Sequence, residues 1–295
     1  MLLRRKIAHK TSSTWMILSL SFILVLPVII GLALYYKSAP LIGSHAMGEL
    51  LTSAEWKPLS GHFGFWPFIS SSLYVTLLSF VFSAPVCLFA AIYLTQFASK
   101  KLINIMHPVI DILASLPSVI YGVWGVIIVV PFIGKHLAPL FGVSTTGYSI
   151  LAGGVVLAIM CIPYMLNMLI DIFNTIPTGL KEASLSLGAT LWESVKHVVL
   201  KGSIPGIFSA FGLGMAKAFG ETMAVLMVVG NMINISVNPF KPGYPLPALI
   251  ANNYGEMLSI PMYDSALMFA ALLLLVIILA INLIFRFIIY KTQIL

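Results

Sequence analysis

The hydrophobic positions of this sequence gather in six long stretches, which polar and proline-rich segments separate. Each stretch has about 20 or more mostly apolar residues, the length that a helix needs to cross the roughly 30 Å hydrocarbon core of a membrane. The stretches are residues 15–36, 68–95, 106–132, 149–170, 203–230 and 262–285. The pattern predicts an all-α integral membrane protein with six transmembrane helices, the first of them a permanent anchor and not a cleaved signal peptide.

The composition agrees with a surface that faces lipid. Hydrophobic residues make up 60% of the 295 residues and charged residues only 8%, and the mean hydropathy is +1.04. Soluble domains are about one quarter charged, because charged side chains must cover their wetted surface. A chain of this size with so few charges cannot cover such a surface, so its surroundings must be the lipid bilayer.

The positions of the basic residues predict the orientation of the chain. Lysine and arginine collect on the cytoplasmic flanks of transmembrane helices. With the N-terminus inside, eleven of the 16 basic residues fall inside and four fall outside, at Lys37, Lys57, Lys135 and Lys241, while Lys217 falls within a stretch. We therefore expect both termini in the cytoplasm. The net charge of +7 is an orientation signal and gives no support to nucleic-acid binding.

The sequence shows no recognisable motif for a catalytic site, a metal site or a cofactor site. The six histidines form no HxxxH or HExxH group, and Cys87 and Cys161 lie singly inside apolar stretches, where thiols usually serve packing. The nine acidic residues are scattered, and no Gly-x-x-x-x-Gly-Lys-Ser/Thr phosphate loop occurs. We expect no metal site, no cofactor, no disulfide and no catalytic site, and without a phosphate loop the chain is not expected to be an ATPase.

The inside segment 171–201 has the pattern of two short helices with a break between them. Pro177 suits the first turn of a helix, and Gly188 suits the left-handed cap that ends it. Thr190 and Glu193 then have the spacing of a capping box, which starts the second helix. Both helices carry an apolar face. Such a pair docks on another subunit or lies on the membrane surface, and the periodicity alone leaves both interpretations open.

The third stretch is interrupted by prolines and glycines and carries the polar residues Asp111, Ser115 and Ser118. Irregular backbone at membrane depth persists only where protein or a water-filled cavity surrounds it. In transporters, substrate sites tend to form at such breaks. The same residues also suit a proline-kinked helix that only packs against its neighbours.

The fifth stretch places Lys217 at its midpoint, with Glu221 four residues on and expected on the same helix face. A charge at that depth costs about 2.5–3.5 kcal/mol even on the lenient insertion scale. In one interpretation the two charges neutralise each other, or partners on other helices, as a structural brace. In the other, Lys217 meets an anion midway across the membrane. The nearby Gly212, Gly214 and Gly220 leave room for a helix or a ligand.

The inside segment also resembles the EAA loop of bacterial ABC importer permeases. Its Glu182 and Ala183 are followed at the family spacing by Gly188, whereas Ser184 replaces the second alanine and Lys201 replaces the usual proline. In that family the loop forms a coupling helix that sits in a groove of the cytoplasmic ATPase. The residues that the resemblance implies in coupling are Glu182, Ala183, Gly188 and Trp192.

Three further runs look like the permeases of the Pst phosphate importers. They are residues 116–122, 181–193 and 220–225, and the Gly-Glu-Thr-Met-Ala-Val sequence of the last run is closer to the C-type subunit than to its A-type partner. Where this chain has Lys217, that family more often has arginine. The residues that we expect in the substrate pathway are Lys217, Glu221, Thr222, Ser115, Ser118 and Tyr121.

The resemblance implies a type I (MetI-like) ABC importer permease fold. Residues 1–37 would form the cytoplasmic N-terminus and the anchor, 38–67 an extracytoplasmic loop, and 68–295 a five-helix transmembrane domain with coupling helices at 177–201. The implied function is the translocation pathway of an ATP-driven phosphate importer in the bacterial inner membrane, with alternating access. The implied partners are a second homologous permease subunit, two ATP-binding subunits and an extracytoplasmic phosphate-binding protein.

Three alternatives remain at the level of the sequence. A permease for sulfate, molybdate or an amino acid would carry the same coupling loop. A secondary transporter would show broken spans at matching positions of two related halves, whereas only the third stretch is strongly broken. A membrane-embedded enzyme would require a cluster of histidines or carboxylates.

Overall fold

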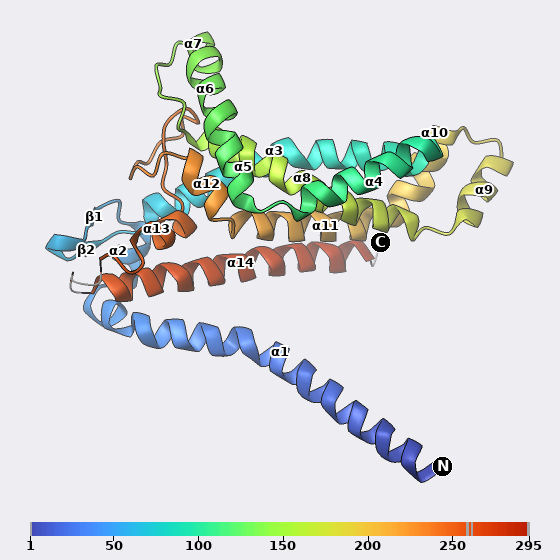
Figure 1. Ribbon diagram of the computed structural model, residues 1–295, viewed down its shortest axis with the longest axis horizontal. Helices are drawn as coiled ribbons and strands as arrows, with labels where there is room; N and C mark the ends of the chain where they lie inside the picture. The colour runs from blue at the N-terminus through green and yellow to red at the C-terminus, as the bar shows by residue number, and fades with distance from the viewer. Residues whose placement is uncertain (1, 258–259, 261, 294–295) are drawn as a thin grey trace.

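The computed structural model describes residues 2–257, 260 and 262–293, and most of them are helical (Figure 1). Within this part of the chain, six helical segments are long and apolar enough to cross a membrane, which confirms the predicted number. They are Ser12–Ser44, Trp66–Gln96, Ser118–Leu140, Ile150–Asn174, Leu191–Phe219 and Tyr263–Thr292.

Short elements connect the long helices. The α-helices in chain order are α1 (Leu2–Ser44), α2 (Met47–Thr52), α3 (Trp66–Gln96), α4 (Lys100–Ser115), α5 (Ser118–Trp124), α6 (Val130–Phe132), α7 (Ala138–Leu140), α8 (Ile150–Asn174), α9 (Thr178–Ser186), α10 (Leu191–Ser194), α11 (Lys201–Phe219), α12 (Met223–Val228), α13 (Leu246–Asn253) and α14 (Tyr263–Gln293). Two short strands, β1 (Trp56–Lys57) and β2 (His62–Phe63), form an antiparallel hairpin. Turns of π-helix over Gly125–Val129, Ile133–Leu137 and Val195–Leu200 join neighbouring α-helical pieces without a break.

Helix α8 forms the centre of the bundle, and α3 and α11 both pack against it. Glycines bring α8 close to α3, and α11 close to α14. A Cβ atom at Gly154 of α8 would lie 2.8 Å from the Cβ of Leu78 on α3, and one at Gly212 of α11 would lie 2.7 Å from the Phe285 ring of α14. Any larger residue at these two positions would push the helices apart. The room that the sequence predicts around Gly212 is therefore filled by a helix and not by a ligand.

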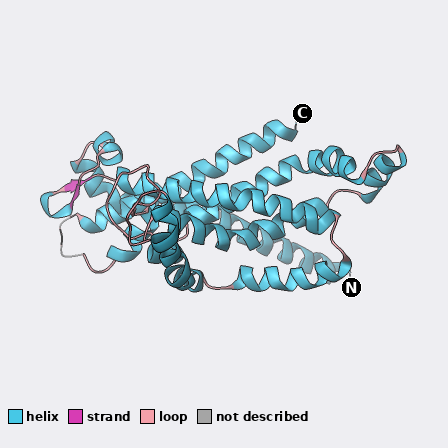
Figure 2. Cartoon of the chain, turned by 90° about the horizontal axis from the view of Figure 1, so that it is seen from above, coloured by secondary structure: helices cyan, strands magenta, loops and turns pink. Residues whose placement is uncertain are grey.

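The short elements α2, β1, β2 and α13 gather at one end of the bundle, called here the hairpin end (Figures 1 and 2). The ring of Trp56 meets four aromatic rings edge-on, those of Phe63, Phe65, Phe68 and Tyr263, at centroid distances of 4.9–6.0 Å. This aromatic cluster joins the hairpin to α3 and α14. The segment expected as a loop at 38–67 is thus largely ordered, because its aromatic residues form a small core of their own.

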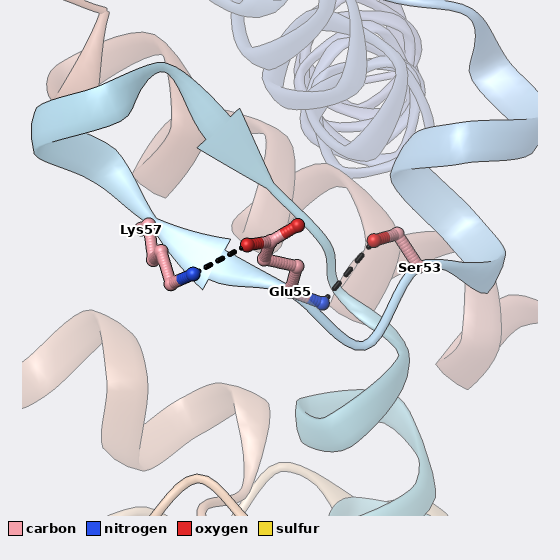
Figure 3. A network of polar contacts seen from close by, with 3 residues as sticks. All are labelled: Ser53, Glu55 and Lys57. Atoms are coloured by element: carbon pink, nitrogen blue, oxygen red, sulfur yellow. Dashed lines mark hydrogen bonds and ion pairs between the residues drawn. The ribbon is translucent and has the colours of Figure 1, made fainter.

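The hairpin carries an ion pair on its exposed side (Figure 3). Lys57 Nζ donates to Glu55 Oε1 at 2.6 Å, and the backbone N–H of Glu55 donates to Ser53 Oγ at 3.2 Å. The hydrogen bond from Lys57 lowers the pKa of the Glu55 carboxyl. Both side chains face solvent, so the pair contributes little to stability.

Helix α1 packs on α14 through its second half and diverges from it toward the N-terminus (Figure 1). A Cβ atom at Gly31 would lie 3.3 Å from the Leu275 side chain, and Leu41 is fully buried. The apolar side chains between Trp15 and Ile30 are exposed, as expected for a helix that lipid surrounds. The helix continues to Ser44, beyond residue 37, where the sequence places the end of the anchor.

The third predicted span is divided in the structure. The sequence predicts one helix over 106–132, but Leu116 and Pro117 are extended, so α4 ends at Ser115 and a new helix begins at Ser118. Proline lacks a backbone N–H and disfavours helical backbone at the residue before it, which explains the break. The membrane-length segment is therefore Ser118–Leu140, and α4 is a separate helix beside α8.

The fifth span begins earlier and ends earlier than predicted. The sequence predicts 203–230, but the helix runs without interruption from Leu191 to Phe219, after which Gly220, Glu221 and Thr222 separate α11 from α12. No glycine or proline interrupts residues 191–201, and Val195 and Val199 are buried against the bundle. The predicted second short helix is thus the beginning of the fifth span. Two spans are broken, where the sequence suggests one.

Candidate functional site

The first candidate site is the segment that joins α8 to α11, at the end of the bundle opposite the hairpin, called here the coupling end. Helix α9 ends at Ser186, and Gly188 follows with a φ of 89°. Residues other than glycine rarely adopt this left-handed backbone conformation. The predicted glycine cap is therefore confirmed. A Cβ atom at Gly188 would have no neighbour within 4 Å. The glycine is therefore needed for its backbone conformation and not for space.

The capping box predicted after this glycine is also present. The backbone N–H of Thr190 donates to Glu193 Oε2 at 2.8 Å, and the backbone N–H of Glu193 donates to Thr190 Oγ1 at 3.3 Å. Each side chain satisfies a backbone donor that the helix leaves free. The left-handed glycine and the capping box together fix the angle between α9 and α10.

All four residues predicted for coupling lie on the surface of this segment: Glu182, Ala183, Gly188 and Trp192. Leu187 beside them is 89% exposed, and Trp192 is 51% exposed. The apolar face that the sequence predicts for the second short helix divides in the structure, because Val195 and Val199 are buried whereas Trp192 faces outward. An apolar surface of the coupling end is thus available for a partner.

The second candidate site is the break between α11 and α12, which lies between the two ends of the bundle (Figure 1). Lys217 is in the last turn of α11 and is exposed on the helix surface. Its ammonium group lies 4.2 Å from the centre of the Tyr164 ring on α8. A cation at this distance is attracted by the negative face of the ring. The tyrosine therefore holds the lysine in place without neutralising its charge.

Glu221 and Thr222 form the connection between the two helices, and both are half-buried. Glu221 Oε1 accepts a hydrogen bond from the backbone N–H of Ala224, in the first turn of α12, at 3.4 Å. Thr222 Oγ1 donates to the carbonyl of Gly220 at 3.5 Å. The carboxylate thus satisfies a free donor at the start of α12.

The predicted arrangement of Lys217 and Glu221 is wrong in two respects. The lysine is near the end of a span and not at its midpoint, and the two residues do not share a helix face, because α11 ends at Phe219. Among the described residues no ion pair joins them. Each charge instead lies at the helix end whose dipole suits it, the cation at the C-terminus of α11 and the carboxylate at the N-terminus of α12.

The predicted residues of α4 and α5 lie beside the break that separates these two helices. Tyr121 is buried, and its hydroxyl donates to the carbonyl of Leu113 at 2.7 Å, which ties α5 to α4. Ser115 is exposed and donates to its own helix, and Ser118 is half-buried. The hydroxyl protons of Tyr121 and Ser115 are thus already used within the chain.

Helices α5 and α12 pack against each other, so the two broken spans are neighbours. A Cβ atom at Gly122 would lie 3.3 Å from the Cα of Ala224 and closer still to the Met227 sulfur. The glycine allows this approach. The structure therefore brings the predicted residues near the α4–α5 break to the same part of the bundle as those at the α11–α12 break.

Two polar residues of α8 belong to this region and do not emerge from the sequence. Tyr164 faces Lys217, and Asn167 Nδ2 donates to Asp111 Oδ1 of α4 at 3.0 Å. The two residues are three positions apart and so lie on one face of an otherwise apolar helix. That spacing is the signal by which they could have been found.

The region as a whole offers one cation, several hydroxyl and amide groups, and two carboxylates, of which Glu221 accepts from the start of α12 and Asp111 accepts from Asn167. Such a set can bind an anion by charge attraction and hydrogen bonds. Within the described residues, no three His, Cys, Asp or Glu side chains lie close enough together to hold a metal ion.

Comparison with known proteins identifies relatives that match most of the chain. The sequence family called binding-protein-dependent transport system inner membrane component matches residues 83–292. The probable ABC transporter permease protein YqgH of Bacillus subtilis is 38% identical over 210 residues, which are 70% of this chain and 66% of that protein. The phosphate transport system permease protein PstC of Haemophilus influenzae is 31% identical over 289 residues, which are 93% of this chain and 90% of that protein.

A second PstC protein, from Xylella fastidiosa, is 34% identical over 248 residues, which are 79% of this chain and 76% of the relative. Among solved structures, a chain of the MetNI methionine ABC transporter in an inward-facing conformation matches with a TM-score of 0.58 and 23% identity, over 75% of this chain and 93% of that one. This likeness confirms the MetI-like fold. The chain is therefore a member of the binding-protein-dependent transport system inner membrane component family, the permeases of ABC importers.

Proposed function

We propose that the chain is a permease subunit of an ATP-driven importer and that its substrate is inorganic phosphate. The observation that carries this proposal is the position of Lys217, an exposed cation between the two ends of the bundle that no carboxylate among the described residues neutralises. Ionisable groups at membrane depth are costly and usually serve function. A cation that a tyrosine ring holds in place remains available to an anion.

The choice of phosphate rests on the relatives together with the site. Several of them are named phosphate transport system permeases, and they align over most of this chain. The half-buried carboxylate of Glu221 adds a chemical reason, because a partly protonated oxyanion such as hydrogen phosphate can donate a hydrogen bond to it. Sulfate has no such proton at neutral pH, so a carboxylate beside the lysine favours phosphate over sulfate.

The same proposal includes an orientation and a set of partners. The excess of basic residues supports an orientation with the coupling end and both termini in the cytoplasm and the hairpin end outside. The complex would contain a second homologous permease subunit, two ATP-binding subunits on the coupling ends, and a phosphate-binding protein at the outer face of a bacterial inner membrane. The exposed Trp192 and Leu187 supply the apolar contact for the ATPase.

Transport would follow from movement of the coupling end. When the ATP-binding subunits close, they would displace α9, and the rigid joint at Gly188 would pass that displacement to α10 and α11, which form one continuous helix. Lys217 lies at the far end of this helix. A movement of α11 would thus turn the lysine between outward-facing and inward-facing positions, as alternating access requires.

The deciding experiment measures uptake of labelled phosphate by the complete complex in reconstituted vesicles, normalised to assembled complex. Lys217→Met and Glu221→Gln are made singly and together, with Lys217→Arg as the variant that keeps the charge. If Lys217 meets the anion, the double variant assembles and transports poorly, and Lys217→Arg retains most of the uptake. Lys101→Met, which removes an exposed cation of α4 outside the pathway, should transport normally.

Near-normal phosphate uptake by the double variant would contradict the anion contact and leave the two charges as a structural brace. Competition experiments identify the substrate in the same vesicles. Unlabelled phosphate should suppress uptake, whereas sulfate, molybdate and amino acids should not. Suppression by one of these three compounds would assign the importer to that substrate.

A further inference from the structure

A cavity of about 140 Å³ lies at the coupling end, where the ends of three elements meet. Its polar lining comes from Thr95 and Gln96 at the end of α3, Asn174 at the end of α8, and Thr178 and Lys181 of α9. At about 30 Å³ for each water molecule, this space would hold four or five waters. It is therefore large enough for one tetrahedral oxyanion, and it is separate from the break that holds Lys217.

The cavity has many hydrogen-bond donors that are not fully used. Lys181 is half-buried, and its Nζ donates to Gln96 Oε1 at 2.9 Å, which leaves two ammonium protons free. Gln96 Nε2 donates to Thr95 Oγ1 at 3.2 Å and has a second proton left. The side chains of Asn174 and Thr178 have no hydrogen-bond partner within the described residues.

The charge in this cavity is not balanced. Among the residues that the structure describes, no Asp or Glu lines it. The carboxylates nearest along the chain, Asp171 and Glu182, are exposed and not part of the lining. Lys181 forms no ion pair with any described residue. A partly enclosed ammonium group, surrounded by amide and hydroxyl donors and without a counterion, suits a ligand with several anionic oxygens.

We propose that this cavity binds a phosphate group on the cytoplasmic side of the membrane, carried either by free inorganic phosphate or by the headgroup of an anionic lipid. Both sources present the same tetrahedral anion. The cavity lies at the end of α3, a helix long and apolar enough to cross a membrane, so we expect lipid headgroups near it. The bound group would contact α3, α8 and α9 together. It would thus fasten the coupling helix to the bundle, independently of what the transport pathway carries.

The fastening matters because α9 has few other ties to the bundle. Pro177 precedes the helix, and the left-handed Gly188 follows it. Within the described residues, the bond from Lys181 to Gln96 is the one side-chain hydrogen bond that joins α9 to a transmembrane helix. An anion that engages Gln96 of α3, Asn174 of α8 and Lys181 of α9 would add contacts between α9 and both neighbours and restrict the movement of α9.

The test measures hydrogen exchange of the backbone amides in residues 174–181 of the complete complex. The complex is kept in maltoside micelles, which contain no phosphate, and receives inorganic phosphate, phosphatidylglycerol or sodium chloride at equal ionic strength. At a ligand concentration of ten times the dissociation constant, exchange that requires release of the ligand should slow about tenfold. Slowing by phosphate identifies the free anion, and slowing by phosphatidylglycerol identifies the lipid headgroup.

Three variants separate an anion site from a simple tether. Lys181→Met should abolish the slowing, whereas Lys101→Met, which removes an exposed cation at the same end of the molecule, should retain it. Gln96→Leu removes the hydrogen-bond partner of Lys181 but keeps the charge of Lys181. Phosphate or lipid should therefore still slow exchange in this variant. The proposal is overturned if neither addition slows exchange in the wild-type protein, or if Lys181→Met responds as the wild type does.

Discussion

Two of the joints between helices in this molecule, the one at Gly188 and the one at Gly220–Thr222, differ in their chemistry. The joint at Gly188 is exposed to water and combines a left-handed glycine with a capping box, so its backbone groups are satisfied by residues within five positions of one another. The joint at Gly220–Thr222 lies within the bundle, and no residue in it has a positive φ. Its helix ends are stabilised by charges, Lys217 on one side and Glu221 on the other.

The difference follows from the solvent. In water the free backbone groups at a helix end can form hydrogen bonds with solvent. Only the direction of the next helix then has to be specified, and a left-handed glycine and a capping box specify it locally. In a bilayer each free backbone group is costly, so a break needs polar or charged side chains and close packing from other helices. The first joint therefore determines an angle, whereas the second creates a polar site.

Reversing the charge at the membrane joint should have the largest effect. Glu221→Lys places a second cation next to Lys217 and at the positive end of the α12 dipole, and a charge at membrane depth costs about 2.5–3.5 kcal/mol. We expect a several-fold loss of chain assembled with its partner subunits, measured by co-purification. Glu221→Gln is the control and should assemble. Normal assembly of Glu221→Lys would show that the helix dipoles do not matter here.

The water-exposed joint should be sensitive to backbone conformation alone. Gly188→Ala forces a side chain into the left-handed region, at a cost of about 1 kcal/mol or more. We expect weaker retention of the ATP-binding subunits and reduced ATP-driven uptake, with an even greater loss for Gly188→Val. Gly179→Ala is a matched control, because Gly179 is also without neighbours within 4 Å but has ordinary helical backbone. Equal behaviour of the two alanine variants would contradict the role of the left-handed cap.

The tyrosine that holds Lys217 should have a moderate effect. A cation–π contact contributes about 0.5–2 kcal/mol, depending on how far it is desolvated. Tyr164→Leu should therefore raise the KM for substrate uptake by several-fold, because the lysine loses its fixed position, whereas Tyr164→Phe keeps the ring and should stay near wild type. If the phenylalanine variant is as impaired as the leucine variant, the hydroxyl and not the ring is what matters.

The exposed ion pair of the hairpin should matter least. The bond from Lys57 lowers the pKa of Glu55 below its ordinary value of 4.5, so any stabilisation is present above that pH and is lost as the pH falls through the lowered pKa. Because both groups face solvent, Lys57→Met should leave the melting temperature at pH 7 unchanged. A clear drop at pH 7 that disappears in acid would show that the hairpin end depends on this pair.

The sequence predicts the water-exposed joint well because its determinants are local. Gly188, Thr190 and Glu193 act on neighbouring backbone groups, so their spacing alone gives the cap and the box. The number of spans was also predictable, since it depends on the length of apolar stretches. In the same way, Pro117 predicts a break in the third span, although the sequence does not show that this break separates the span into two helices.

The membrane joint was not predictable, because its determinants come from other helices. Nothing in the run from Lys217 to Met223 forbids a helix, and the predicted continuation beyond Phe219 followed from its apolar character. The helix ends there because α12 turns to pack on Gly122 of α5 and because Glu221 caps its first turn. The contact between Lys217 and Tyr164 joins positions far apart in the chain, so the periodicity of the sequence cannot predict it.

The way in which α1 is attached has a consequence for how this chain tolerates change. The helix is held at its Leu41 end, close to the aromatic cluster around Trp56, and its first half leaves the bundle altogether. The matched family region begins only at residue 83, after α1 and the hairpin. Natural variants and laboratory fusions should therefore accept a longer, shorter or exchanged segment before Gly31, provided that it remains apolar enough for the bilayer. Such a replacement should leave the packing of the other transmembrane helices unchanged.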